Sequence, residues 1–490
     1  MIFNSLTFLL FLLFFTILYW ILKDKYRLAL VFLSSLIFYG FWKIEFLLLI
    51  LFSTFLDFEI SKRLDKISIK FRKKRKFLLV LSVVTNLSLL IYFKYLYFIA
   101  DNINDLFNVF GKSIEINLPN IILPIGISFY TFQTISYTVD VFRKHVNVEK
   151  NFILYGCYVT FFPQLIAGPV LRAGEVIPQI KNRSKFRFKY ISDGIERILY
   201  GLFLKVVLAD NIAPLVDEGF LIDANSLSGI DVFTLAFLFG FQIYFDFAGY
   251  SHIAIGCANM MGIKFPENFN YPYAARSFKS FWKRWHISLS SWIRDYLYLP
   301  LQGIKVIDRN NISKGGLNIE NIKIDELNRN KSLFITWALM GLWHGANWTF
   351  IFWGVYHSIT IFFERLFSPI RKKIHFFNLP IVGWLITLVL SMLSWIPFRA
   401  ESLNDTFIMY SKIFSMDNFL LISMRENIYL ITFILLVFCS LSFLYSEYIS
   451  QKLKKAKSVF FVINTIKFTA MFYFVYIFLR PINQFIYFQF

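Results

Sequence analysis

The sequence is poor in charged residues and in cysteine, and both shortages narrow the class of protein. Only 17% of its 490 residues are charged and 57% are hydrophobic, whereas a soluble globular protein carries about 25% charged residues. Collagen, intrinsic disorder and a soluble multidomain enzyme are therefore excluded. The three cysteines stand far apart in mainly apolar surroundings, and their odd number argues against a disulfide framework. We expect no metal site, and buried structural thiols at Cys157, Cys257 and Cys439.

Acidic residues are scarcer than basic ones. The chain has 31 Asp and Glu against 51 Lys and Arg, which gives a net charge of +20. Nucleic acid is not the expected partner, because the basic residues are grouped between apolar runs, as the positive-inside rule produces. Residues 61–76 are the most basic segment, with Asp65 as their only acid. We expect this segment in the cytoplasm, against anionic membrane lipid.

Long apolar runs take up most of the chain. Several exceed the roughly 20 residues that a helix needs to cross a bilayer, and residues 1–22 contain no charge at all. This first run has neither a basic start nor a small-residue cleavage site, so we predict a membrane helix rather than a cleaved signal peptide. The expected fold class is all-α: a polytopic membrane bundle of about eleven crossings, with both termini outside.

Some segments depart from simple crossing helices. Residues 28–58 predict two helices joined by a tight turn at 43–45, and the polar residues 101–120 predict an outside loop. Residues 121–136 and 152–167 are broken by proline and glycine, which lipid tolerates only where protein or a water-filled cavity covers the backbone. We expect these two to be re-entrant or internal. Further segments are an interfacial stretch at 265–303, a surface loop at 304–331, and helices at 77–93, 193–214, 230–263, 333–363, 379–398, 428–444 and 459–479.

His344 is the histidine best placed for proton chemistry. If residues 333–363 form one helix, His344 lies about 16 Å along it, near the bilayer midplane. An ionisable group there marks a functional site, although a histidine that only packs helices together explains it equally well. On that helix Asn347 would share its face, whereas His357 would face elsewhere and lie at the interface.

Two further stretches place polar groups among apolar ones. His286 stands beside Ser288 in FWKRWHISLSSWIRDYLYLP. Anchoring at the interface explains the Trp and Arg residues but not the serines, so function and anchoring stay equally balanced. In FQIYFDFAGYSHIAIG, Asp246 and Tyr250 share one helix face. A buried carboxylate needs a partner, and for Asp246 we favour an arginine in the bundle over an orienting role beside a histidine.

Together these stretches resemble a known family. FFPQLIAGPVLR, YFDFAGYSHIAIG, the run 281–303 and LWHGANWTFIFWGVYH are similar, in this order, to motifs of the membrane-bound O-acyltransferases. The resemblance is strongest to the bacterial branch with alginate and peptidoglycan O-acetyltransferases, and weaker to teichoic acid D-alanine transferases. It implies that His344 is the catalytic histidine and His286 its companion. It also implies a core at 121–363, between N-terminal membrane helices at 1–120 and C-terminal helices with an outside tail at 364–490.

The resemblance implies an O-acetyltransferase. We expect it to take acetyl from cytosolic acetyl-CoA, with no bound cofactor, and to pass it across the bacterial cytoplasmic membrane to an envelope polysaccharide. Peptidoglycan is favoured over alginate, and a separate extracytoplasmic O-acetyltransferase is the expected partner. The alternative is a transporter or flippase. Expected site residues are His344 as general base, His286 beside it, and Ser288, Asn347, Trp343, Tyr250 and Asp246 around the substrate.

The C-terminal tail INQFIYFQF carries Tyr487 as its only side-chain hydroxyl. An aromatic belt at the membrane surface explains such a tail. The resemblance to a small tyrosine-bearing peptide of teichoic acid D-alanylation systems implies an alternative, in which Tyr487 is an acyl shuttle. An aryl ester at this residue would keep much of the transfer potential of a thioester.

Overall fold

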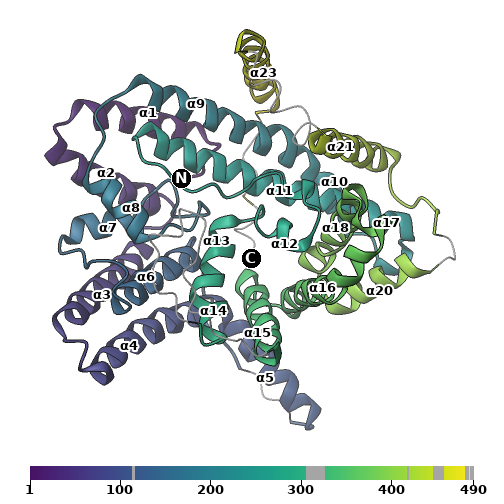
Figure 1. Ribbon diagram of the computed structural model, residues 1–490, viewed down its shortest axis with the longest axis horizontal. Helices are drawn as coiled ribbons and strands as arrows, with labels where there is room; N and C mark the ends of the chain where they lie inside the picture. The colour runs from purple at the N-terminus through teal and green to yellow at the C-terminus, as the bar shows by residue number, and fades with distance from the viewer. Residues whose placement is uncertain (113–115, 305–325, 416–418, 445–456, 480–484, 486–490) are drawn as a thin grey trace. The chain divides into compact units, whose positions relative to one another are not determined.

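The computed structural model describes residues 1–112, 116–304, 326–415, 419–444, 457–479 and residue 485 (Figure 1). Every regular element in these ranges is helical, which confirms the all-α fold. Four helical segments are long and apolar enough to cross a membrane: Arg72–Val109, Phe188–Phe220, Gly229–Met260 and Pro380–Arg399. Shorter apolar helices are Leu6–Ile21, Glu426–Leu441 and Val462–Phe478. The number of crossings, the sides of the termini and the three-part domain division stay predictions.

The described chain forms two compact units. Unit 1 holds residues 1–198 and 253–266, and unit 2 holds 199–252, 267–304 and the described residues from 326 onward. The elements of unit 1 are α1 (Leu6–Ile21), α2 (Asp24–Gly40), α3 (Phe46–Lys66), α4 (Arg72–Leu90), the π-helical η1 (Ile91–Tyr95), α5 (Leu96–Val109), α6 (Ile127–Phe142), α7 (Phe152–Thr160), α8 (Ala173–Lys181) and most of α9 (Phe188–Leu202).

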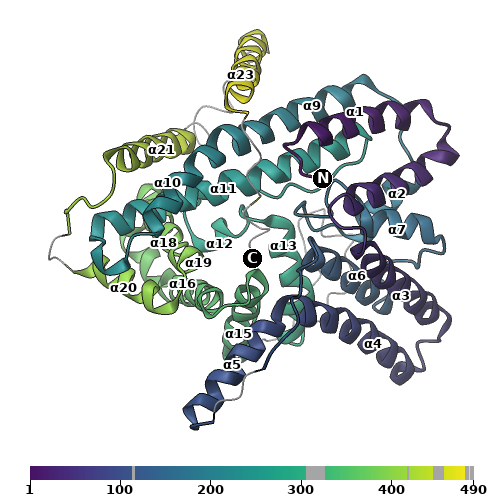
Figure 2. The ribbon, with the colours of Figure 1, turned by 180° about the vertical axis from the view of Figure 1, so that it is seen from behind.

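In unit 1, α3, α4 and α6 pack together around a buried carboxylate. Figure 2 shows α3 and α6 side by side, with α4 next to them. Asp57 of α3 accepts hydrogen bonds from Asn86 Nδ2 of α4 at 2.7 Å and from Ser82 Oγ of the same helix. Thr138 Oγ1 of α6 donates to Asp57 at 3.4 Å. A buried polar group is stable only when it is hydrogen-bonded, so this network fixes the spacing of α3 and α4.

The broken segments lie where the sequence predicts them. α6 starts after Gly126, whose φ of 76° is left-handed and whose Cβ position would meet the carbonyl oxygen of Leu165. After α7 the chain is irregular through Pro163 and Pro169, and residues 161–171 are all buried. Protein therefore covers this non-helical backbone, as a membrane interior requires.

The predicted outside loop at 101–120 is wrong for residues 101–109, which belong to α5. Polarity alone suggested a loop, but Ile99, Ile103 and Leu106 recur at helical spacing. Asn102 Nδ2 also donates to the carbonyl oxygen of Phe98 at 2.6 Å, four residues earlier. The two-helix prediction for residues 28–58 is confirmed, since α2 ends at Gly40 and α3 begins at Phe46.

Unit 2 combines long helices with short ones. Its elements are η2 (Phe203–Ala209, π-helical), α10 (Asp210–Phe220), η3 (Ala224–Ser226), most of α11 (Gly229–Met260), η4 (Pro272–Ala274), α12 (Phe278–Phe281), α13 (Ile287–Ile293), η5 (Arg294–Tyr298, π-helical), α14 (Leu299–Leu301), α15 (Glu326–His344), α16 (Trp348–Lys373), α17 (His375–Asn378), α18 (Pro380–Leu393), α19 (Ile396–Arg399), α20 (Leu403–Phe414), α21 (Glu426–Leu444) and α23 (Lys457–Phe478). Helix α10 runs past Pro214, where we predict an end, because membrane helices tolerate an internal proline. The predicted loop at 304–331 falls mostly outside the described residues, and its last six residues are helical.

A helical hairpin replaces the single helix predicted over residues 333–363. Helix α15 ends at His344 and α16 begins at Trp348. Asn347 is extended, with φ −149°, and its side chain caps α16 by accepting from the Thr349 N–H at 3.0 Å. The two helices run antiparallel in close contact: a Cβ on Gly341 would meet the Phe350 carbonyl oxygen, and one on Gly354 would meet that of Trp337. Only glycine permits this approach.

Candidate active site

His344 lies at the tip of the hairpin, as the last residue of α15. Its side chain is buried. The imidazole is ringed by Trp343 and Trp353, each with a centroid distance of 4.9 Å, and by Phe398 at 5.2 Å. Helix α15 brings His344 into this surrounding, and the break after it turns the chain so that Trp353 on α16 lies against the ring. The site is therefore apolar and shielded from solvent, as acyl transfer without hydrolysis requires.

His286 is held by a hydrogen-bond network at the start of α13. Its Nδ1 donates to Asn268 Oδ1 at 3.0 Å, and the same oxygen accepts from Ser288 Oγ at 2.8 Å. Asn268 Nδ2 in turn donates to Ser251 Oγ at 3.0 Å, which fixes the orientation of the amide. This arrangement puts the proton of His286 on Nδ1 and leaves Nε2 as an acceptor.

The surroundings of His286 keep it uncharged. The side chain is fully buried, and Phe247 lies edge-on at 4.6 Å between ring centroids. Burial in apolar surroundings disfavours the imidazolium and lowers the pKa of His286 to about 3. Within the described residues Nε2 has no hydrogen-bond partner. A neutral histidine with a free acceptor nitrogen is better suited to orient a substrate by accepting a hydrogen bond than to act as a general base.

The two histidines belong to one aromatic cluster. From His286 the contacts run through Phe269 to Trp285, and from Trp285 to Trp395 with centroids 4.8 Å apart. Trp395 contacts Trp353 at 6.0 Å, and Trp353 contacts His344. The structure thus places the two histidines predicted as catalytic in one packed region of unit 2.

His357 lies in the same cluster, and the prediction that it is interfacial is wrong. Its side chain is fully buried, with ring centroids 4.7 Å from Trp353 and 5.0 Å from Trp282. The prediction failed because it measured the angle to His344 along one continuous helix. Among the described residues, neither nitrogen of His357 nor Nε1 of Trp282 and Trp353 has a hydrogen-bond partner. Buried polar atoms without partners are rare and concentrate where a substrate or water binds.

Other predicted site residues have structural partners. Asn347 caps α16 and is exposed, so it does not share a helix face with His344. Asp246 forms an ion pair with Lys205 at 2.6 Å, and Lys205 also pairs with Asp210 at 2.8 Å. The ion-pair partner of Asp246 is a lysine, not the arginine that we favoured.

Tyr250 and Trp343 are both buried. The ring of Tyr250 lies 4.8 Å from that of Phe485, which also contacts Phe247 at 5.8 Å. A tail residue therefore packs beside the aromatic neighbour of His286. Tyr487 itself lies outside the described residues.

A basic pocket of about 470 Å³ adjoins this cluster. Trp282, Trp337 and Met340 line it, and Met340 lies one turn before His344 on α15. Its cationic lining residues are Lys279, Lys283, Arg294 and Arg365. Glu364 also lines the pocket, but its carboxylate accepts from the backbone N–H groups of Phe278 and Lys279. The signal for this pocket was present in the basic residues of 279–294, which we interpreted as headgroup anchors.

Comparison with known proteins identifies the family of this chain. Residues 34–314 and 322–402 match the model of the membrane-bound O-acyltransferase family. The chain is 37% identical to the probable alginate O-acetylase AlgI of Pseudomonas aeruginosa, over 93% of this chain and 84% of the relative. It is 35% identical to the peptidoglycan O-acetyltransferase of Helicobacter pylori, over 76% of this chain and 71% of the relative.

A more distant relative is the teichoic acid D-alanyltransferase of Streptococcus thermophilus, 30% identical over 51% of this chain and 59% of the relative. The match to the family model covers most of the chain, including both histidines and the hairpin. The chain belongs to the membrane-bound O-acyltransferase family and is an acyltransferase.

Proposed function

We propose that this enzyme moves acetyl groups from cytosolic acetyl-CoA to a polysaccharide of the cell envelope, with peptidoglycan favoured over alginate. The observation that carries the proposal is the basic pocket, which ends one helical turn from a buried histidine. A donor with a polyanionic nucleotide and a slender thioester arm matches this shape: its phosphates pair with cations at the mouth and its acetyl end points to the aromatic cluster. Family membership speaks against the transporter alternative.

His344 acts as general base in this proposal. Its imidazole removes the proton of the acceptor hydroxyl, whose oxygen attacks the thioester carbonyl. The tetrahedral oxyanion collapses, the C–S bond breaks, and the CoA thiolate takes the proton back from the imidazolium. The indole N–H of Trp353 has no hydrogen-bond partner among the described residues. The ring centroids of Trp353 and His344 are 4.9 Å apart. We assign this N–H to the oxyanion, and His286 with Ser288 to orientation of the substrate.

The outer half of the path is also proposed. The expected membrane is the bacterial cytoplasmic membrane, and a separate extracytoplasmic O-acetyltransferase completes the transfer to sugar. Tyr487 is the candidate shuttle between the two enzymes. Its support is Phe485, two residues earlier, whose buried ring packs on Tyr250 and Phe247. Phe247 is in turn the aromatic neighbour of His286.

The test uses the purified full-length protein in nanodiscs. We expect His344→Gln to reduce the release of free CoA thiol from acetyl-CoA by about 10²- to 10⁴-fold, the range of general-base catalysis. The matched control is His375→Gln, because His375 is exposed on α17 and away from the cluster residues in contact with His344. Thermal melting should be nearly the same in both variants. Thiol release by His344→Gln within threefold of the control would refute the assignment.

A further inference from the structure

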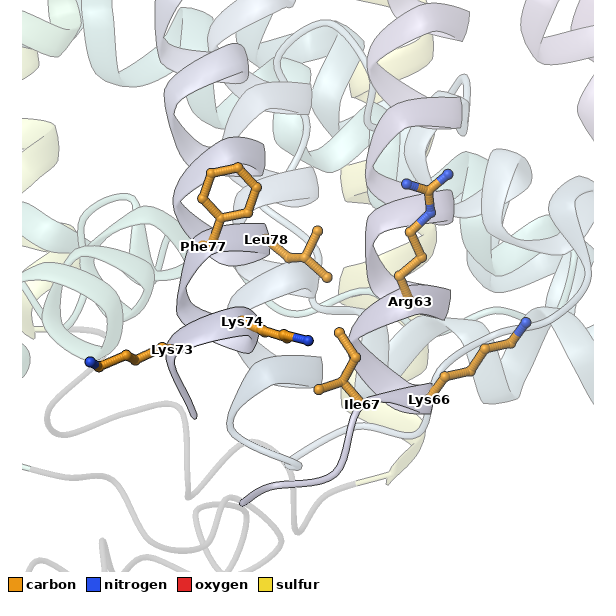
Figure 3. Close-up of a pocket in the computed structure, with 7 residues that line it drawn as sticks. All are labelled: Arg63, Lys66, Ile67, Lys73, Lys74, Phe77 and Leu78. Atoms are coloured by element: carbon orange, nitrogen blue, oxygen red, sulfur yellow. The ribbon is translucent and has the colours of Figure 1, made fainter. Parts of the chain in front are cut away.

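A second basic pocket lies in unit 1, between the end of α3 and the start of α4. Its volume is about 620 Å³. Arg63 and Lys66 line it from α3, and Lys73, Lys74 and Phe77 from α4. Figure 3 shows Lys74 pointing from α4 toward α3, while the side chains of Lys73 and Lys66 extend outward on opposite sides.

The four cations of this pocket are not neutralised by the described part of the chain. No acidic residue lines the pocket, and none of the four forms an ion pair there. The nearest acids in sequence are already engaged: Asp65 pairs with Lys144 at 2.9 Å and Glu59 with Lys62 at 2.8 Å. Four exposed cations around one hollow attract an anion strongly.

The N-terminus of α4 adds to the uncompensated positive charge at this pocket. The first turn of α4 consists of basic residues, 72–75, and contains no acid and no side-chain cap. The N-terminus of a helix is the positive end of its dipole, so cations there are unfavourable unless an anion compensates them. Arg75 is an exception, since it is buried and donates to the Phe142 carbonyl oxygen at 2.7 Å.

Beyond the cations, both helices present apolar side chains outward. On α4 these are Phe77, Leu81 and Val84, spaced i, i+4, i+7 and each at least 40% exposed. On α3 the exposed set with the same spacing is Leu48, Phe52 and Phe55. Helix α4 belongs to the segment Arg72–Val109, which is long and apolar enough to cross a membrane, and the pocket lies at the N-terminal end of that segment. A ligand here meets cations at one end and lipid-facing apolar stripes at the other.

We propose that this pocket is a specific binding site for one anionic phospholipid. Its phosphate lies among Arg63, Lys66, Lys73 and Lys74, and its acyl chains follow the exposed stripes of α3 and α4. Ile67 and Phe77 supply the apolar floor at the level of the glycerol backbone. The Asp57 network holds the two helices at a fixed spacing, so the pocket exists before the lipid binds.

The test is lipid retention by the full-length protein, measured by native mass spectrometry after exchange into neutral detergent with added phosphatidylglycerol. The variant is Arg63→Gln, Lys66→Gln, Lys73→Gln and Lys74→Gln combined. The matched control removes the same charge from another basic segment of unit 1, through Lys181→Gln, Lys185→Gln, Arg187→Gln and Lys189→Gln. We expect at least tenfold weaker retention in the pocket variant and near wild-type retention in the control.

Two further arms separate lipid from other ligands. Phosphatidylcholine tests whether a net negative charge on the lipid is needed, and inorganic phosphate tests whether the acyl chains are needed. Ile67→Trp keeps every cation but fills the floor, and should also weaken phosphatidylglycerol retention. Without lipid, the pocket variant should melt no lower than wild type, because it removes repulsion at the start of α4. Three results would each overturn the proposal. They are equal phosphatidylglycerol retention by the pocket variant and the control variant, wild-type retention of phosphatidylcholine equal to that of phosphatidylglycerol, or wild-type retention of inorganic phosphate equal to that of phosphatidylglycerol.

Discussion

Two basic pockets in the described part of the chain are lined by similar cations but end on different surfaces. The pocket between α3 and α4 has four cations and no acid, and continues into exposed apolar stripes. The pocket of unit 2 also has four cations, but its inner wall is formed by Trp282 and Trp337, beside the buried His357. A cluster of Lys and Arg therefore specifies an anion, while the surface behind it specifies which molecule carries that anion.

The largest expected effect comes from displacing the inner wall of the unit 2 pocket. Gly354→Ala places a Cβ against the Trp337 carbonyl oxygen and forces α15 and α16 apart. Overpacking against backbone should cost about 3 kcal/mol, and acetyl transfer should be lost. Differential scanning fluorimetry and thiol release measure the two effects.

The control for that variant is Gly40→Ala in unit 1. There the added Cβ meets only the Leu47 side chain, at 2.9 Å, which can move. We expect a small change in melting and normal activity. Equal destabilisation by both substitutions would show that the hairpin does not depend on close backbone contact.

A second prediction separates the two pockets by their ligands. Lys283→Gln with Arg365→Gln should raise the KM for acetyl-CoA by about 100-fold, since each charge-assisted hydrogen bond contributes about 1.5–3 kcal/mol and two are removed. The kcat should change little. The four-residue variant of the α3–α4 pocket should leave this KM unchanged. A similar rise in KM for both variants would mean that the cations act only by general attraction.

The smallest expected effect concerns the pH profile of activity, through the protonation of His286. Asn268→Asp puts a carboxylate against His286 Nδ1 and raises the pKa of His286 from its low value of about 3. A raised pKa means that the imidazole becomes protonated, and Nε2 ceases to accept, as pH falls through the new value. Activity of the variant should therefore decline several-fold between pH 8 and pH 6.

In wild type, His286 stays neutral over that range and contributes no such decline. Asn268→Ala is the control, because it removes the hydrogen bond without adding charge. Superimposable pH profiles of wild type and Asn268→Asp would show that His286 does not contact the substrate during the reaction. Phosphatidylglycerol retention should be unaffected in all three proteins.

Patterns local in sequence predicted much of the fold. The apolar runs, the turn before Phe46 and the proline and glycine breaks around Gly126 and Pro163 follow from periodicity and helix chemistry. The hairpin was missed because the polar break at residues 345–347 is only three residues long and apolar residues resume at Trp348. The glycine and the Asn347 cap in HGANWT were the signal for it.

The candidate site was predicted less completely. His344 and His286 stood out as lone histidines among apolar residues, and the family resemblance raised both. Asn268 and the burial of His357 could not be predicted, because they depend on contacts between segments distant in sequence. Asp246 was expected to have a partner, but only the three-dimensional packing identifies Lys205.

His286 has one further property, which concerns evolution and engineering. Its φ of 41° and ψ of 54° place a non-glycine residue in the left-handed region, which costs on the order of 1–3 kcal/mol. Glycine or asparagine adopts this conformation more easily. A library screened only for heat resistance would enrich those residues at position 286, whereas a library screened for acetyl transfer would retain histidine. At this residue, selection for stability and selection for catalysis pull in opposite directions.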